Sequence, residues 1–178
     1  MIRFLFFLPF LFLLNCGGEE ILASSPYFQF ENGKLYYRNK LFNGNRVEDM
    51  NEIRRIEPYR EGLKHGVETI VHQNGIKVAD FPYTDGKRNG EFREWHEDGT
   101  YRSYGKYIDD KPVGEFWKWH RNGVPFVFEK YSDKGVLLVT KKWRDTGQIF
   151  LNLRFEEGDY IGLDGSKLCD PADSSKLK

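Results

Sequence analysis

Residues 83–106 read YTDGKRNGEFREWHEDGTYRSYGK, and the spacing of aromatic and glycine residues in this stretch recurs along most of the chain. An aromatic residue, a glycine and then a second glycine return in the same order, one such set for each stretch of this length. The recurring positions are Tyr59, Tyr83, Tyr107, Tyr131 and Phe155, then Gly66, Gly90 and Gly114, and then Gly75, Gly99, Gly123 and Gly147. The step of 24 residues from Tyr59 to Tyr83 is called the repeat period below. Self-similarity at a fixed period of this size predicts an array of structural repeats.

Each repeat carries two turn signals with strand-forming sequence between them. In residues 83–106 the first signal runs from Asp85-Gly86 to Asn89-Gly90, and the second is Asp98-Gly99. Asn-Gly and Asp-Gly pairs accept the positive φ angles of tight primed hairpin turns. The segments between them are rich in the aromatic and β-branched residues that strands favour. Each repeat therefore predicts one β-hairpin, here with strands near residues 91–96 and 100–107.

The expected fold is all-β: an elongated antiparallel sheet of consecutive β-hairpins, one hairpin for each repeat period. The repeat domain is expected over residues 27–163. It divides into a degenerate N-terminal cap, four full units and one partial unit, at 37–58, 59–82, 83–106, 107–130, 131–154 and 155–163.

The aromatic residues of the expected strands do not follow a simple alternation. Phe92 and Trp95 are three positions apart, so a regular strand puts them on opposite faces of the sheet. Either a β-bulge corrects the register, or both faces carry aromatic side chains and leave apolar surface available for a partner.

The tryptophans are the candidate partner-binding residues. Trp95, Trp119 and Trp143 follow the repeat period, so packing of the sheet itself is the competing interpretation for these three. Trp117 occurs in one unit only, and it is the leading candidate for an exposed anchor.

The N-terminus has the pattern of an exported protein. Arg3 precedes an apolar run over residues 4–14, which is shorter than the roughly 20 residues that a membrane-spanning helix needs. This pattern predicts a signal peptide over residues 1–15. Residues 13–17, LLNCG, resemble the lipobox of bacterial lipoproteins. The resemblance implies acylation of Cys16 and anchoring in a membrane of the cell envelope, the outer membrane being the expected one.

Two polar segments flank the expected repeat domain. Residues 16–26 are interpreted as the lipidated cysteine and a flexible tether, and residues 164–178 as a disordered tail. Once Cys16 is acylated, Cys169 in the tail has no partner for an intramolecular disulfide.

Charge balance and motifs argue against several classes of function. Lys+Arg and Asp+Glu both number 27, which gives no electrostatic footprint for nucleic acid. His72, His96 and His120 share the period, but equivalent residues two strands apart lie roughly 10 Å from one another and cannot bind one metal ion together. The sequence has no phosphate loop, dinucleotide fingerprint or nucleophile elbow. It therefore predicts a protein that is not an enzyme and that has no metal or cofactor.

The recurring pattern, Tyr-x-[Asp/Glu]-Gly-x-x-x-Gly followed by an aromatic residue, Trp and Asn/Asp-Gly, resembles the MORN repeat in its bacterial variant form. Residues 59–66 and 83–90 match best, and residues 107–114 lack the first glycine. The resemblance implies an elongated sheet of hairpins that serves protein interaction, scaffolding or lipid-proximal functions.

Three functions are compatible with this resemblance. The first is an envelope lipoprotein whose sheet binds another protein. The second is an antitoxin-like or immunity module that blocks a toxin, since related bacterial variants are classed as antitoxin-like. The third is glycan binding through the aromatic residues.

Overall fold

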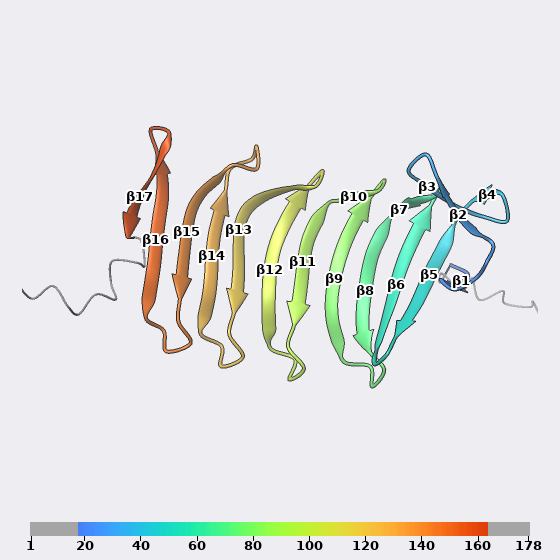
Figure 1. Ribbon diagram of the computed structural model, residues 1–178, viewed down its shortest axis with the longest axis horizontal. Helices are drawn as coiled ribbons and strands as arrows, with labels where there is room; N and C mark the ends of the chain where they lie inside the picture. The colour runs from blue at the N-terminus through green and yellow to red at the C-terminus, as the bar shows by residue number, and fades with distance from the viewer. Residues whose placement is uncertain (1–17, 164–178) are drawn as a thin grey trace, which may run out of the picture.

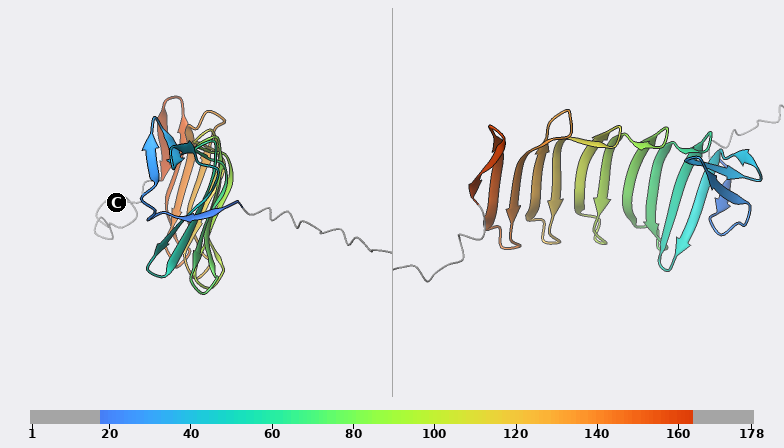
Figure 2. Two further views of the ribbon diagram at one scale, coloured as in Figure 1. Left: turned by 90° about the vertical axis from the view of Figure 1, so that its right-hand side faces the viewer. Right: turned by 45° about the horizontal axis from the view of Figure 1, so that its top comes forward.

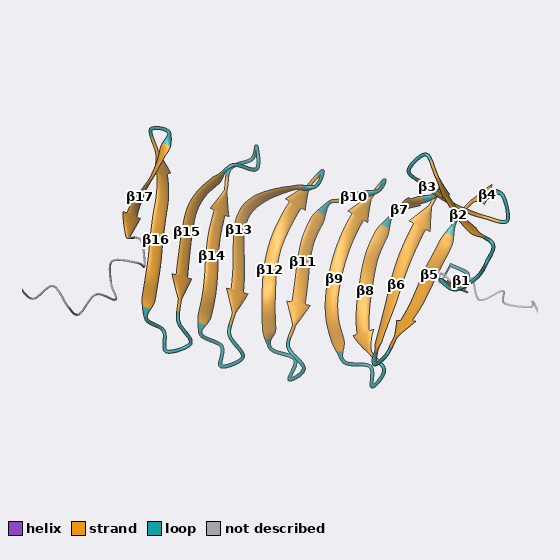
Figure 3. Cartoon of the chain, viewed as in Figure 1, coloured by secondary structure: helices purple, strands orange, loops and turns teal. Residues whose placement is uncertain are grey.

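The computed structural model describes residues 18–163, which form strands and turns and no helix (Figure 3). Fourteen strands make one large sheet, and three more make a small sheet. The strands are β1 Glu20–Leu22, β2 Phe28–Glu31, β3 Lys34–Tyr37, β4 Lys40–Leu41, β5 Gly44–Met50, β6 Ile53–Arg60, β7 Leu63–Lys64, β8 Gly66–His72, β9 Lys77–Thr84, β10 Lys87–Arg88, β11 Gly90–Trp95, β12 Tyr101–Ile108, β13 Lys111–Trp119, β14 Pro125–Tyr131, β15 Leu137–Trp143, β16 Ile149–Glu156 and β17 Asp159–Leu163. The all-β prediction is confirmed for this range.

The large sheet follows the order of the sequence, from β5 near one end to β17 at the other (Figure 1). Its strands pair antiparallel except for β1, which runs parallel to β5. Seen end-on, the strands lie behind one another in one curved layer (Figure 2). Over most of its length no second layer from the described residues covers either face, so side chains on both faces meet solvent or one another. Within residues 18–163 there is no helix that could span a membrane.

The turn at Asp85-Gly86 and the loop that contains Gly99 differ in conformation. At the upper end in Figure 1, Asp85 and Gly86 form a two-residue turn with positive φ at both positions, 48° and 86°, as primed turns require. At the lower end three residues separate His96 from Thr100, and only the third, Gly99, has positive φ, at 81°. The Gly99 N–H donates to the His96 carbonyl at 2.9 Å. The prediction of a primed turn is therefore wrong for this lower loop, because only its glycine takes the left-handed conformation.

Residues 18–26 are not a flexible tether, and this part of the prediction is corrected. The Asn45 N–H donates to the Glu19 carbonyl at 2.8 Å, and the Ala23 N–H donates to the Val47 carbonyl at 2.6 Å. Between them the Ile21 side chain is 9% exposed. Burial of one apolar side chain beside a hydrogen-bonded edge orders a segment that composition alone marks as a linker.

The small sheet of β2, β3 and β4 lies at the N-terminal end of the large sheet (Figure 1). Ile21, Leu35 and Phe42 form a buried core there, and Phe28, Tyr37 and Tyr59 pack against it. This end is thus the part of the described chain where a second layer covers the sheet. The expected signal peptide, Cys16 and the tail with Cys169 lie outside the described residues.

Candidate binding surfaces of the single-layer sheet

Aromatic side chains occupy both faces of the sheet. In β11, Phe92 lies opposite Gly105 and Trp95 lies opposite Tyr101. The extra residue of the β-bulge between these pairs is Arg102 on the partner strand, so β11 itself alternates regularly. Of the two alternatives that the sequence left open, the structure has aromatic residues on both faces.

One face, named here the tyrosine face, carries Phe81, Phe92, Tyr107, Phe116 and Tyr131. The ring centroid of Phe92 lies 5.8 Å from that of Phe81 and 5.6 Å from that of Phe116. Phe92 and Phe116 are each only 8% exposed although no second layer of described residues covers them. Neighbouring rings shield them instead, so this face is a closed hydrophobic layer with a hollow of 430 Å³ on its surface.

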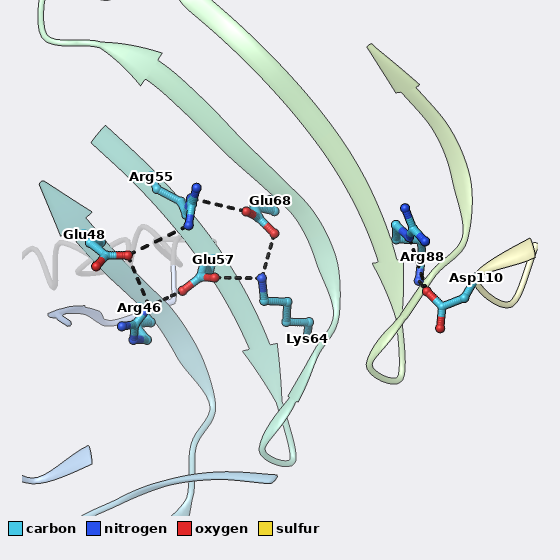
Figure 4. Close-up of polar contacts among 8 residues, drawn as sticks. All are labelled: Arg46, Glu48, Arg55, Glu57, Lys64, Glu68, Arg88 and Asp110. Atoms are coloured by element: carbon cyan, nitrogen blue, oxygen red, sulfur yellow. Dashed lines mark hydrogen bonds and ion pairs between the residues drawn. The ribbon is translucent and has the colours of Figure 1, made fainter. Parts of the chain in front are cut away.

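Polar groups border the tyrosine face. The Arg88 guanidinium lies 4.0 Å from the ring centroid of Tyr107 and pairs with Asp110 at 3.4 Å (Figure 4). The Tyr131 hydroxyl donates to Glu129 at 2.9 Å. Burial and this hydrogen bond to a carboxylate raise the pKa of Tyr131. The aromatic layer therefore has a fixed polar rim.

The opposite face, named here the tryptophan face, carries Trp95, Tyr101, Trp117, Trp119, Phe128 and Trp143. These rings form a continuous series of contacts: Trp95 to Tyr101 at 6.1 Å, Tyr101 to Trp119 at 6.1 Å, Trp119 to Trp117 at 6.1 Å, and Trp117 to Trp143 at 6.5 Å between centroids. None of the six is buried, and Tyr101 is 51% exposed. This face is therefore the more open of the two aromatic layers.

Trp117 belongs to this series and does not project from it alone. Its ring centroid lies 4.4 Å from that of Phe128, and its indole N–H donates to Glu115 at 3.3 Å. Trp117 is half-buried, as are Trp95, Trp119 and Trp143. The structure thus brings the four predicted tryptophans together on one face.

The tyrosines and glycines of the repeat pattern have different positions. Tyr59, Tyr83, Tyr107, Tyr131 and Phe155 lie in β6, β9, β12, β14 and β16. Gly66 and Gly90 begin β8 and β11, Gly114 lies within β13, and Gly75, Gly99, Gly123 and Gly147 lie in the lower loops.

The histidines of the pattern link neighbouring hairpins. His96 Nε2 lies 3.3 Å from the Trp119 carbonyl, and His120 Nε2 lies 3.2 Å from that of Trp143. In residues 18–163 no group of three or more His, Cys, Asp or Glu side chains could hold a metal ion.

A network of six charged side chains, two of them buried, adjoins the tyrosine face, and the sequence reasoning missed it. Its members are Arg46, Arg55 and Lys64 on the basic side and Glu48, Glu57 and Glu68 on the acidic side (Figure 4). Lys64 Nζ lies 2.7 Å from a carboxylate oxygen of Glu57 and 2.7 Å from one of Glu68. Glu57 and Glu68 are only 5% and 6% exposed. Three basic side chains therefore neutralise three carboxylates in this part of the sheet, where few apolar side chains cover the strands.

Ionisation of this network is set by competition between burial and pairing. Burial alone would raise the pKa of Glu57, but hydrogen bonds and charges from Lys64 and Arg46 outweigh it and hold the pKa below its ordinary value of 4.5. Burial would lower the pKa of Lys64, but its two carboxylate partners raise it well above 10.5. Both groups are therefore charged at neutral pH.

One sequence signal could have revealed the network. Phe81 stands one repeat period after Glu57, and Phe92 stands one repeat period after Glu68. Glu68 also lies directly opposite Phe81 across β8 and β9. Glu57 and Glu68 therefore occupy positions that phenylalanine occupies in the next hairpin. This substitution indicates that the row of inward-facing side chains on this face continues with charged residues.

No protein-family model and no curated protein matches the chain. Among solved structures, the "Crystal structure of GtfA/B complex bound to UDP and GlcNAc" is similar over 78% of this chain, at 13% identity and a TM-score of 0.31. The chain spans 29% of the length of the chain that it matches there. A similarity at this level carries no argument about function.

Proposed function

We propose that this chain is an exported, lipid-anchored protein of the cell envelope, with a sheet of MORN-like hairpin repeats that binds another protein. Its role is binding and not catalysis. The observation that carries the proposal is the tryptophan face, where six aromatic side chains lie in contact on an uncovered side of the sheet.

The repeat assignment has support from the lower loops. Gly75, Gly99, Gly123 and Gly147 have φ angles of 85°, 81°, 79° and 84°. Each accompanies the same pair of backbone hydrogen bonds around its loop. Residues one repeat period apart thus adopt equivalent conformations in four successive hairpins, as a repeat array requires.

The tryptophan face suits a protein partner better than the tyrosine face does. Tryptophan and tyrosine are enriched among the residues that dominate binding energy at interfaces. Phe92 and Phe116 on the tyrosine face are each only 8% exposed, whereas Tyr101 is 51% exposed. A partner therefore gains more apolar burial on the tryptophan face.

Site-specific photocrosslinking in the native membrane tests this proposal. A photoreactive phenylalanine analogue at Tyr101 samples the tryptophan face. The same analogue at Tyr160, which is 48% exposed in the last strand, is the matched control. We expect a discrete protein adduct from position 101 and none from position 160. No adduct at 101, or equal adducts at both positions, would exclude this face as the interface. A toxic enzyme in the adduct would identify the immunity function instead.

A further inference from the structure

A pocket of 340 Å³ lies at the lower end of the sheet, between the loops of the β8–β9 and β11–β12 hairpins. We name it the inter-loop pocket. Its walls include the basic side chains of Lys77, Arg102 and Arg121 and the rings of Trp95 and His96. It is separate from the tyrosine-face hollow and from the charged network.

The pocket is open because Val78 and Arg102 do not pack against a histidine ring here as Phe126 does in a later hairpin. Beyond the pocket, the ring of Phe126 lies 4.8 Å from that of His120. Arg102 stands one repeat period before Phe126, as His96 does before His120, and both Arg102 and His96 line the pocket. Val78, one period earlier again, is smaller still and also lines the pocket. The hollow thus lies beside Val78 and Arg102, at the position that Phe126 and Phe150 occupy in later hairpins.

The charges of the lining favour an anion. Lys77, Arg102 and Arg121 face one carboxylate, that of Glu97. Glu97 pairs with Arg121 at 3.4 Å, and Lys77 pairs with Asp80 at 2.8 Å. Arg102 makes no ion pair and no side-chain hydrogen bond to any residue between 18 and 163. Its guanidinium is therefore available to a ligand.

The remaining walls restrict how a ligand can lie. His96 Nε2 lies 3.3 Å from the Trp119 carbonyl, and this contact holds its ring in place as a wall. The Lys77 ammonium lies 5.6 Å from the ring centroid of Trp95. Ile53 and Val78 add apolar surface. The pocket thus offers a free guanidinium and further positive charge beside an apolar and aromatic wall.

We propose that the inter-loop pocket binds a phosphate monoester. The planar fork of Arg102 matches two phosphoryl oxygens. Lys77 and Arg121, although each is paired with one carboxylate, bring further N–H donors to the same pocket. Three cationic side chains can donate to the three terminal oxygens of a phosphoryl group, whereas a carboxylate offers two oxygens. A volume of 340 Å³ also leaves room for a small organic group against Trp95 and Val78. The pocket shares the Trp95 ring with the tryptophan face, but binding of the ester requires no protein partner.

Isothermal titration calorimetry on the full chain at low ionic strength tests the proposal, with glycerol 3-phosphate, inorganic phosphate and acetate as probes. We expect saturable binding of glycerol 3-phosphate and no binding of acetate. Arg102→Gln should weaken binding about tenfold or more, the factor expected for one lost charge-assisted hydrogen bond. Val78→Phe should abolish binding, because the larger phenylalanine ring occupies the space that the ligand needs. Lys106→Gln removes one charge from the other end of the same strand and should leave affinity unchanged.

Each other outcome has a defined meaning. Equal affinity for inorganic phosphate and the ester would retain the site and identify free phosphate as its ligand. Absence of binding, equal binding of acetate, or unchanged affinity in both Arg102→Gln and Val78→Phe would overturn the proposal. Far-UV circular dichroism and thermal melts of each variant establish that the sheet is intact in these comparisons.

Discussion

Phe116 and Trp117 are adjacent in strand β13, yet their rings belong to separate aromatic clusters on opposite faces of the sheet. Phe116 is 8% exposed and contacts Phe92 and Tyr131 at 5.6 and 5.1 Å between ring centroids. Trp117 is half-buried and contacts Phe128 at 4.4 Å. A single layer of strands therefore has two hydrophobic layers. One closes on itself and stabilises the fold, and the other stays more open to solvent.

The first prediction concerns Trp117 itself. Sequence alone favours an exposed anchor with little influence on stability, but Trp117 touches Trp119, Phe128 and Trp143. Trp117→Ala should therefore lower the free energy of unfolding by about 2 kcal/mol, somewhat less than for a fully buried aromatic residue. Trp119→Ala, which loses contacts to Tyr101 and Trp117, should cost a similar amount. Urea denaturation of both variants measures this. An unchanged midpoint for Trp117→Ala would contradict the packing role.

Gly105 is the subject of the second prediction. Its φ angle is not in the left-handed region, so the glycine is needed for space rather than for backbone conformation. A Cβ atom there would lie 2.6 Å from the Phe116 ring and 2.7 Å from the Phe92 ring. Gly105→Ala should destabilise the sheet by about 2–3 kcal/mol through overpacking. Gly99→Ala in an open loop should cost about 1 kcal/mol, from its positive φ alone.

A double variant separates overpacking from other causes. Phe116→Leu reduces the ring that the new methyl group meets, so Gly105→Ala should cost less in the Phe116→Leu background than in the wild type. Residues in contact commonly show such non-additivity, about 0.5–3 kcal/mol in size. Thermal melts of the four proteins complete the cycle. Strictly additive losses would indicate that the Gly105 backbone, and not the space between the rings, is the constraint.

The strands and lower loops were largely predictable from the sequence, because spacing and turn residues are local signals. The Asp98-Gly99 pair located a loop correctly, although its conformation is not a primed turn. The opposite orientations of Phe92 and Trp95 were one of the two alternatives that strand alternation left open. Each of these features depends on residues within one hairpin.

Features that depend on distant pairing were not predictable. Glu20–Leu22 is a strand because β5, which is distant in the sequence, offers it a parallel edge. The burial of Glu57 and Glu68 depends on Lys64 meeting both of them. In the sequence these carboxylates look like ordinary surface charges, and only the assembled sheet shows that they are enclosed.

The third prediction concerns the anchor. Cys16 should be acylated, because it stands two residues after Leu14, where the apolar run of the expected signal peptide ends. Metabolic labelling with a fatty acid should mark the wild-type protein and not Cys16→Ala. The variant should also be released from the membrane fraction, because acyl chains contribute about 0.8 kcal/mol per buried CH₂. Cys169→Ala is the matched control and should be labelled as strongly as the wild type. Equal labelling of Cys16→Ala would remove the lipoprotein assignment.

The charged network should make stability depend on pH in the acidic range. The pKa of Glu57 lies below 4.5 in the fold, so its stabilising contribution is fully present above pH 4.5. That contribution is lost as the pH falls through the lower pKa of the folded state. Lys64 has a raised pKa and remains protonated over this whole interval. Acid therefore titrates the carboxylate side of the network.

The fourth prediction follows from this linkage. Glu57→Gln keeps the size of the side chain but removes the charge that Lys64 and Arg46 share. At neutral pH it should cost about 3 kcal/mol, because two partly buried cations lose a common partner. Between about pH 5 and pH 3 the wild type should lose stability more steeply than this variant, since the variant lacks the titrating group. Glu156→Gln, which removes an exposed carboxylate paired with Arg154 at 2.8 Å, should retain the wild-type slope. Urea denaturation across this pH range measures the free energy of unfolding of the three proteins. If the wild type and Glu57→Gln lose the same free energy of unfolding as the pH falls, Glu57 does not govern the acid response.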